Sequence, residues 1–83
     1  MKYRLVITEE ARDHIKRLDK VIVKKVMKKL PILILDPFGL SKRLVNYRCG
    51  TFRYRVGDYR IIFDIREDAV EILKVAHRRE VYK

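Results

Sequence analysis

The sequence is poor in the residues on which disulfide, metal and nucleophile chemistry usually depend. It contains one cysteine, two histidines and no tryptophan in 83 residues. Because Cys49 is alone, no disulfide can form within the chain, which favours a reducing compartment. Two distant histidines and one cysteine do not make a metal site. With no Gly-rich phosphate loop and no Ser/His/Asp or Cys/His nucleophile motif, we expect no metal and no small-molecule cofactor.

Long apolar runs are also missing. The first eight residues alternate rather than forming the apolar core of a signal peptide. The longest apolar stretch, Leu30–Leu35, is too short to span a bilayer. We therefore expect a cytoplasmic protein with no membrane partner.

Basic residues are abundant. Lysine and arginine number 21 against 11 acidic residues, a net charge of +10. Such an excess in a short chain points to a polyanionic partner, whereas the alternative is a merely soluble surface. The length fits one domain, residues 1–83.

The first half of the chain carries helical spacing after one short strand. Residues 3–7 alternate as a strand does, and Thr8 precedes Glu9 and Glu10, acids that favour a helix start. This pattern predicts a helix to about Leu18.

A second helix is predicted after Asp19, which is placed to cap it. Its apolar positions recur at helical spacing: Val23, Val26, Met27 and Leu30. Pro31 either ends this helix or kinks it, with residues 32–35 continuing as a buried turn. Asp36–Gly39 is a stop signal.

The second half changes to strand periodicity, with strands predicted at 44–48, 51–56, 59–65 and 70–76 and a polar tail after them. The fold class is therefore α+β: an N-terminal strand, a helical hairpin and an antiparallel β-meander.

Gly57 and Asp58 are typical of a two-residue hairpin turn. That turn fixes the register, so one sheet face is apolar: Phe52, Tyr54, Val56, Tyr59, Ile61 and Phe63. The opposite face then gathers Arg53, Arg55 and Arg60, although opposed like charges are destabilising. From residue 41 on there are eight arginines and three lysines, against three and seven before it. Guanidinium groups bind phosphate bidentately, so we interpret the sheet arginines as a phosphate site and the helix lysines as general steering.

The run Arg53–Phe63 and the ending His77–Tyr82 resemble the RelE/ParE toxin superfamily, in particular its RelE-like branch, and the similarity covers essentially the whole chain. The resemblance implies the RelE-like microbial RNase fold and the toxin of a type II toxin–antitoxin system. In that branch the toxin enters the ribosomal A site, where the mRNA 2′-hydroxyl attacks the adjacent phosphate without a metal. The implied partners are mRNA, the ribosome with its 16S rRNA, and an acidic antitoxin that binds through an amphipathic helix, giving a toxin–antitoxin hetero-oligomer.

Carried over to this sequence, the resemblance assigns catalysis to Arg55, Arg60, Arg78, Tyr82 and His77. RNA binding is assigned to Arg53, Lys42, Arg43 and Arg79. Arg53 and Arg55 stand where that branch has lysines, and a guanidinium essentially never deprotonates. The general base is therefore left between His77 and Tyr82, His77 being the better matched in pKa.

Some assignments stay open at this point. Tyr82 either stacks on a base or closes the core edge, Tyr3 is expected in the core, and His14 is expected to be exposed. The alternative functions are a ParE-like gyrase poison and a non-catalytic RNA-binding module.

Overall fold

The computed structural model describes residues 3–43 and 52–81. Eight elements follow one another in the described chain: β1 (Arg4–Ile7), α1 (Glu9–Lys16), α2 (Lys20–Leu33), α3 (Pro37–Leu40), β2 (Lys42–Arg43), β3 (Phe52–Val56), β4 (Tyr59–Arg66) and β5 (Ala69–His77). This order confirms the α+β class. The strand predicted at 44–48 lies outside the described residues.

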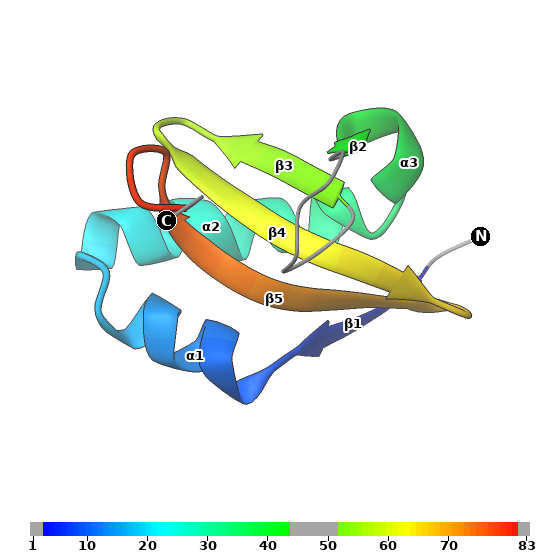
Figure 1. Ribbon diagram of the computed structural model, residues 1–83, viewed down its shortest axis with the longest axis horizontal. Helices are drawn as coiled ribbons and strands as arrows, with labels where there is room; N and C mark the ends of the chain where they lie inside the picture. The colour runs from blue at the N-terminus through cyan, green and yellow to red at the C-terminus, as the bar shows by residue number, and fades with distance from the viewer. Residues whose placement is uncertain (1–2, 44–51, 82–83) are drawn as a thin grey trace.

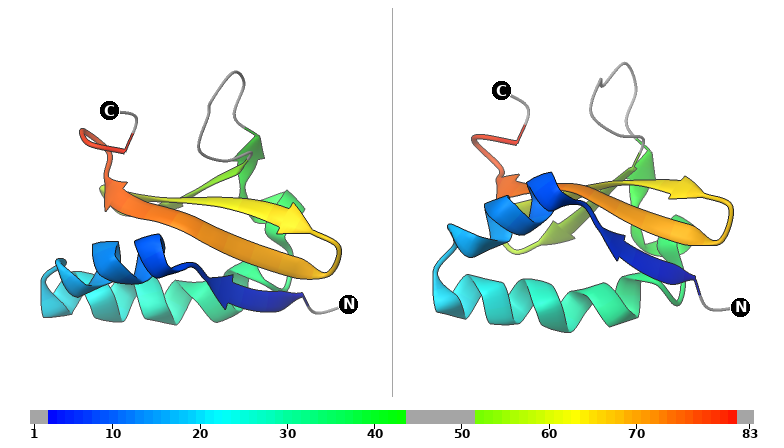
Figure 2. Two further views of the ribbon diagram at one scale, coloured as in Figure 1. Left: turned by 60° about the horizontal axis from the view of Figure 1, so that its bottom comes forward. Right: turned by 90° about the horizontal axis from the view of Figure 1, so that it is seen from below.

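The strands form one sheet in the order β1-β5-β4-β3-β2 (Figure 1). The pairs from β2 to β5 are antiparallel, as the meander requires, whereas β1 runs parallel to β5. The two long helices lie on one face of the sheet, and the segment after β5 rises on the other face (Figure 2). The sheet therefore has one face packed on helices and one outer face.

The connection from β1 to α1 is held at the edge of β5. The Thr8 hydroxyl accepts a hydrogen bond from the Ala11 backbone N–H at 3.2 Å, which caps α1. The same hydroxyl donates to the Ile72 carbonyl at 2.7 Å. Thr8 thus ends strand pairing and starts the helix in one step. The helix itself ends at Lys16, shorter than the predicted Leu18.

Helix α2 passes through Pro31 and ends at Leu33, so the proline does not end the helix at that point. It lies in the last turn, where the helix loses only one internal bond to the missing N–H. Asp19 stands at the N-cap but its side chain makes no capping bond. The predicted stop is itself a short helix: Asp36 caps α3 by accepting from the Gly39 N–H at 3.1 Å.

The core lies between the helices and the inner face of the sheet. Its buried members are Ala11, Val26, Leu30, Leu33, Ile34, Tyr54, Val56, Ile61, Phe63, Val70, Ile72 and Val75. Tyr3 and Phe52 are only partly buried and pack against this cluster. The hairpin register is the predicted one, with Val56 opposite Tyr59 and Arg55 opposite Arg60.

The last two strands are longer than predicted. Strand β4 includes Arg66, and the turn to β5 is made by Glu67, with a positive φ of 56°, and Asp68. A bulge interrupts the β4–β5 register between Ile62 and Phe63. No helix in the described part of the chain is long and apolar enough to cross a bilayer.

Candidate nucleic-acid interface

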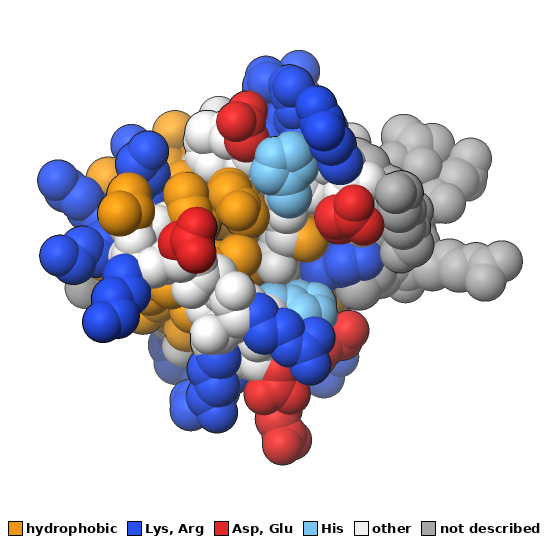
Figure 3. Space-filling model, turned by 90° about the vertical axis from the view of Figure 1, so that its left-hand side faces the viewer, with side chains coloured by type: hydrophobic (Ala, Val, Ile, Leu, Met, Phe, Trp, Pro, Cys, Tyr) orange, Lys and Arg blue, Asp and Glu red, His pale blue; other side chains and the backbone are white. Residues whose placement is uncertain are grey.

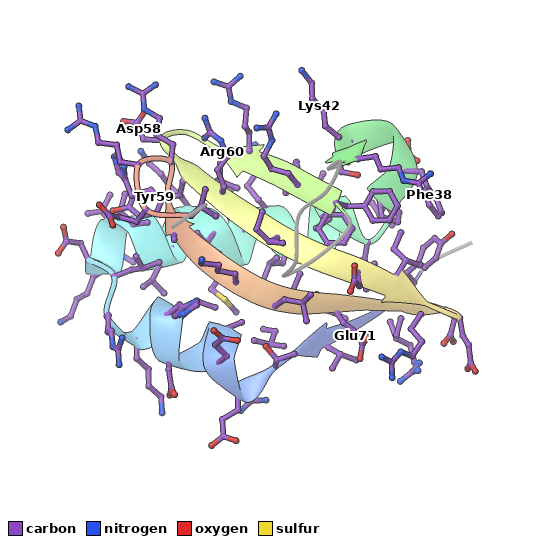
Figure 4. All side chains as sticks on the ribbon, in the orientation of Figure 1. Phe38, Lys42, Asp58, Tyr59, Arg60 and Glu71 are labelled. Atoms are coloured by element: carbon purple, nitrogen blue, oxygen red, sulfur yellow. The ribbon has the colours of Figure 1, made fainter. Side chains whose placement is uncertain are left out.

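Five basic side chains come from four strands and share the outer face of the sheet. The register places Lys42 opposite Arg53, Arg53 opposite Ile62, and Ile62 opposite Lys74. Because alternate residues of a strand share a face, Arg55 and Arg60 lie on the same side. We call this set the basic face: Lys42, Arg53, Arg55, Arg60 and Lys74. Figure 4 shows Arg60 at the hairpin end of the sheet with Asp58 and Tyr59, and Lys42 farther along.

The members of the basic face differ in exposure. Lys42 and Arg55 are exposed, Arg53 and Lys74 are half-buried, and Arg60 keeps only 6% of its surface exposed. Arg43 alternates with Lys42 on β2, so it is exposed but lies off the basic face. Exposure therefore does not follow the predicted roles: Arg55 and Arg60 were both assigned to catalysis, but Arg55 is open to a ligand and Arg60 is buried.

Arg60 turns back toward its own hairpin. Its Nη1 donates to the carbonyl of Gly57 and to that of Tyr59, both at 3.0 Å. The glycine has a φ of +58°, a left-handed conformation that allows the tight turn. Arg53, Arg55 and Arg60 share the outer face as predicted, but Arg60 is buried there.

Two fully buried apolar side chains lie outside the main core. Ile62 and Val81 are fully buried, yet neither belongs to the core cluster between sheet and helices. Ile62 points to the outer face beside Arg60. Because Arg60 is buried on this face, its guanidinium needs hydrogen-bond acceptors from the protein, and backbone carbonyls provide them.

The segment after β5 carries two further arginines to the hairpin end. The Arg78 backbone N–H donates to the Asp58 carbonyl at 2.8 Å, and the N–H groups of Glu80 and Val81 donate to the His77 carbonyl at 2.8 and 3.0 Å. These bonds close a turn on the outer side of the sheet (Figure 2). The side chains of Arg78 and Arg79 are both exposed, as the predicted phosphate contacts require.

His77 stands at the base of this turn. Its Nδ1 accepts from the Arg79 backbone N–H at 3.2 Å, and its ring meets Tyr59 edge to face with centroids 5.4 Å apart. An accepting Nδ1 places the proton of the neutral ring on Nε2. In this arrangement the neutral ring of His77 offers a hydrogen-bond donor at Nε2.

His14 is not the exposed residue that the sequence predicts. Its side chain is 21% exposed, and its Nδ1 accepts from the Val75 backbone N–H at 3.3 Å. Strand β1 pairs with β5 only as far as Ile72. The His14 side chain of α1 therefore covers the edge of β5 beyond the end of β1 and provides an acceptor for a backbone N–H there.

The acidic residues of the outer face lie at its other end. Asp64 on β4 lies opposite Glu71 on β5 in the strand register. The Oε1 atom of Glu71 lies 3.4 Å from Arg66 Nε in an ion pair. Figure 4 shows Glu71 far from Arg60 along the sheet. Positive charge is thus concentrated toward the hairpin. The sequence analysis did not assign Lys74 to the basic face. The signal for it is the step of three residues between the apolar positions Ile72 and Val75, which indicates the bulge.

The helix lysines form a separate basic surface. Lys20, Lys24, Lys25, Lys28 and Lys29 are all exposed on α2. Between Lys25 and the hairpin lies a hollow of about 190 Å³ lined by Ile22, Val56 and Tyr59. Figure 3 shows Lys and Arg side chains around this end of the molecule, with both histidines visible.

Tyr82, the remaining predicted site residue, lies outside the described residues. Among residues 3–43 and 52–81 no group of histidine, cysteine and carboxylate side chains is placed to hold a metal ion. The described site therefore consists of cations, one imidazole and backbone groups.

Comparisons with known proteins agree on one family. The model of the ParE toxin of the type II toxin–antitoxin system parDE matches residues 5–82. Toxin RelG of Mycobacterium tuberculosis is 31% identical over 86 residues, covering 100% of this chain and 99% of that toxin. A chain of the toxin–antitoxin complex RelBE2 from M. tuberculosis superposes with a TM-score of 0.85 at 31% identity, covering 94% of this chain and 100% of that one.

A more distant structure, the archaeal RelE–RelB complex of Pyrococcus horikoshii, has a TM-score of 0.73 at 22% identity and covers 98% of this chain and 100% of its own. It shares the fold. Because the family model spans nearly the whole sequence and RelG matches end to end, the chain belongs to the RelE/ParE family of toxins from type II toxin–antitoxin systems, and it is RelE-like.

Proposed function

We propose that this toxin is a ribosome-dependent endoribonuclease that cleaves mRNA in the A site without a metal ion. The observation that carries the proposal is the gathering of cations from four strands and the 78–81 turn on the outer side of the sheet. A surface of this kind binds the phosphates of single-stranded RNA.

The reaction needs charge neutralisation at the phosphate. The 2′-oxygen forms a bond to phosphorus while the bond to the 5′-oxygen breaks, and negative charge builds on the phosphoryl oxygens. The exposed guanidinium groups of Arg55 and Arg78 are assigned to those oxygens, because they donate bidentately. Lys42, Arg43, Arg53 and Arg79 hold the flanking phosphates.

Two proton transfers complete the cleavage. His77 is assigned as the proton donor to the leaving 5′-oxygen; its protonated ring carries hydrogen on both nitrogens, so the Arg79 N–H bond to Nδ1 opens in that form. The proton of the 2′-hydroxyl goes to Tyr82, the other candidate base, because a guanidinium essentially never deprotonates.

The partners follow from charge and exposed apolar area. A net charge of +10 favours 16S rRNA and an acidic antitoxin. Exposed apolar side chains on α2, on α3 and between them offer that antitoxin a docking surface: Val21, Met27, Ile32, Leu35, Phe38 and Leu40. We place the toxin–antitoxin hetero-oligomer in the cytoplasm. Absence of any small acidic protein from a pulldown in the native host would contradict this partner.

The test is to add the toxin to a translation system and map mRNA 5′ ends with and without ribosomes. We expect cuts only when ribosomes are present, and losses of about 100-fold or more for Arg55→Ala and Arg78→Ala. Arg4→Ala is the matched control, because Arg4 is an exposed arginine paired with Asp68 at 3.1 Å away from the basic face.

A second candidate is gyrase poisoning, because the matching family model is that of ParE toxins. The same protein is therefore added to DNA gyrase and cleaved DNA complexes are measured. Intact mRNA together with trapped gyrase–DNA complexes would replace the proposed function with this one. If the protein neither cleaves mRNA nor traps gyrase on DNA, the result favours a non-catalytic RNA-binding module.

A further inference from the structure

We propose that a trough between α2 and the β3–β4 turn is a docking site for an acidic amphipathic helix, separate from the surface that binds RNA. Two hollows of about 190 and 370 Å³ lie there and share the lining residues Lys25, Val56 and Gly57, so they form one trough. Residues of α2 make one wall, and residues 56–59 of the hairpin make the other. The inference rests on the proposed function for the identity of the partner, the antitoxin.

One flank of α2 forms the long wall of the trough. Lys25, Lys28, Lys29 and Ile32 follow one another at helical spacing and all line the larger hollow. Val21 extends this flank by one turn, and it is 64% exposed, whereas Ile32 is 42% exposed. At 1.5 Å per residue the flank is about 16 Å long, which equals about three turns of a partner helix.

The charge of this wall calls for a partner of opposite sign. Lys25, Lys28 and Lys29 are exposed, and within residues 3–43 and 52–81 none of them forms an ion pair with a carboxylate. Like charges three and four residues apart on a helix destabilise it. Carboxylates of a bound helix would relieve this repulsion, so an acidic partner gains from contact with all three lysines.

The apolar part of the trough favours a peptide over RNA. Val56 and the half-buried Ile22 form its floor, and Ile32 leaves apolar surface exposed beside them. Phosphates would contact the lysines but leave that surface wet, whereas an amphipathic helix covers both.

The trough also lies apart from the basic face. Arg55 and Val56 are consecutive in β3, so their side chains point to opposite faces of the sheet. Val56 points to the helix side, where α2 lies (Figure 2). A ligand in the trough therefore contacts the hairpin from the side opposite to the RNA phosphates.

The experiment measures two affinities for each of three proteins. The wild type recovers its acidic partner from the native host, and the purified partner and a single-stranded RNA are then labelled for fluorescence anisotropy. Lys25→Glu/Lys28→Glu alters the trough. Lys20→Glu/Lys24→Glu is the matched control, because it makes the same change of charge at exposed lysines of α2 that do not line either hollow.

We expect the trough variant to bind the partner about 100-fold more weakly than the wild type, and the control about threefold, since only the first places like charges against the partner. The two variants should bind RNA equally. In the ribosome assay the partner should stop cleavage by the wild type and the control, but not by the trough variant at the same concentration. Lys25→Gln/Lys28→Gln replaces the trough variant if that protein does not fold.

Equal losses of partner affinity in the two variants overturn the proposal, because net charge alone would then hold the partner. A larger loss of RNA affinity in the trough variant than in the control also overturns it, since the trough would then bind RNA. So does a wild type that recovers no acidic partner. If none of the proteins cleaves mRNA, the proposed nuclease function fails, and the partner affinities still decide the role of the trough.

Discussion

At the scale of single residues, Tyr54 places a phenol inside the core. Only 9% of its surface is exposed, and burial raises the pKa of the Tyr54 phenol above its ordinary value of 10.0. The folded state therefore holds this proton more tightly than the unfolded chain does. The resulting stability is fully present below pH 10 and is lost as the pH rises past the pKa of the folded state.

We expect the free energy of unfolding of the wild type to fall more steeply above pH 10 than that of Tyr54→Phe. Urea unfolding at pH 8, 10 and 11 measures the free energy of unfolding of both proteins. Their difference at pH 8 gives the part of the effect of the substitution that does not depend on pH. Parallel pH curves for the two proteins would show that the phenol gains no proton affinity on folding.

His14 is a second residue whose role depends on a single bond. Replacing it by alanine leaves the Val75 N–H without its acceptor. We expect His14→Ala to lower the free energy of unfolding by about 1–3 kcal/mol. His14→Asn is the matched variant, because its Oδ1 can accept near the position of Nδ1 and should recover part of the loss. Urea unfolding at pH 8 compares them, and equal stability of all three would remove this role.

At the scale of elements, α2 contains a proline that its last turn tolerates. Pro31 is exposed, so replacing it opens no cavity. Pro31→Ala restores a helix N–H, and we expect it to raise the free energy of unfolding by about 1–3 kcal/mol. Thermal or urea unfolding measures the change, with Lys29→Ala as a surface control within about 0.5 kcal/mol. A destabilised Pro31→Ala protein would mean that the proline limits the unfolded chain more than it strains the helix.

The hairpin was predictable as an element because its information is local. A two-residue turn at Gly57 and Asp58 and a period of two together determine every cross-strand pair of β3 and β4. The β4–β5 bulge was not predictable in the same way. Leu73 is the extra residue between the pairs Ile62–Lys74 and Phe63–Ile72, and the three-residue step from Ile72 to Val75 is the one trace that it leaves in the apolar pattern.

At the scale of the whole molecule, whose net charge is +10, basic side chains form two surfaces, the basic face of the sheet and the lysines of α2. If the basic face binds RNA phosphates, its cations should contribute to the dependence of RNA affinity on salt, and the α2 lysines should not. The slope of log K against log salt is about −0.7 for each phosphate contacted on a single strand. We therefore expect the double variant Lys42→Ala/Arg55→Ala to reduce the slope by about 1.4.

The matched control is Lys24→Ala/Lys28→Ala, which removes the same charge from α2. Its slope should stay near that of the wild type, because those lysines lie on the helix layer (Figure 2). Fluorescence anisotropy with a labelled single-stranded RNA, over a series of salt concentrations, measures both variants. Equal reductions in slope would show that RNA also follows α2.

The amino-acid sequence by itself determined the α+β class, the hairpin register, the positive charge and the resemblance to RelE-like toxins. The first three depend on composition, local turns and periodicity, and the resemblance depends on the residues of the runs 53–63 and 77–82; all are present in the chain before it folds. Only the tertiary structure decided that β1 pairs in parallel with β5, that Lys74 joins the basic face, and that Arg55 is exposed while Arg60 is buried. The physical reason is that exposure and hydrogen-bond partners depend on segments distant in sequence, such as the turn at 78–81 that meets Asp58.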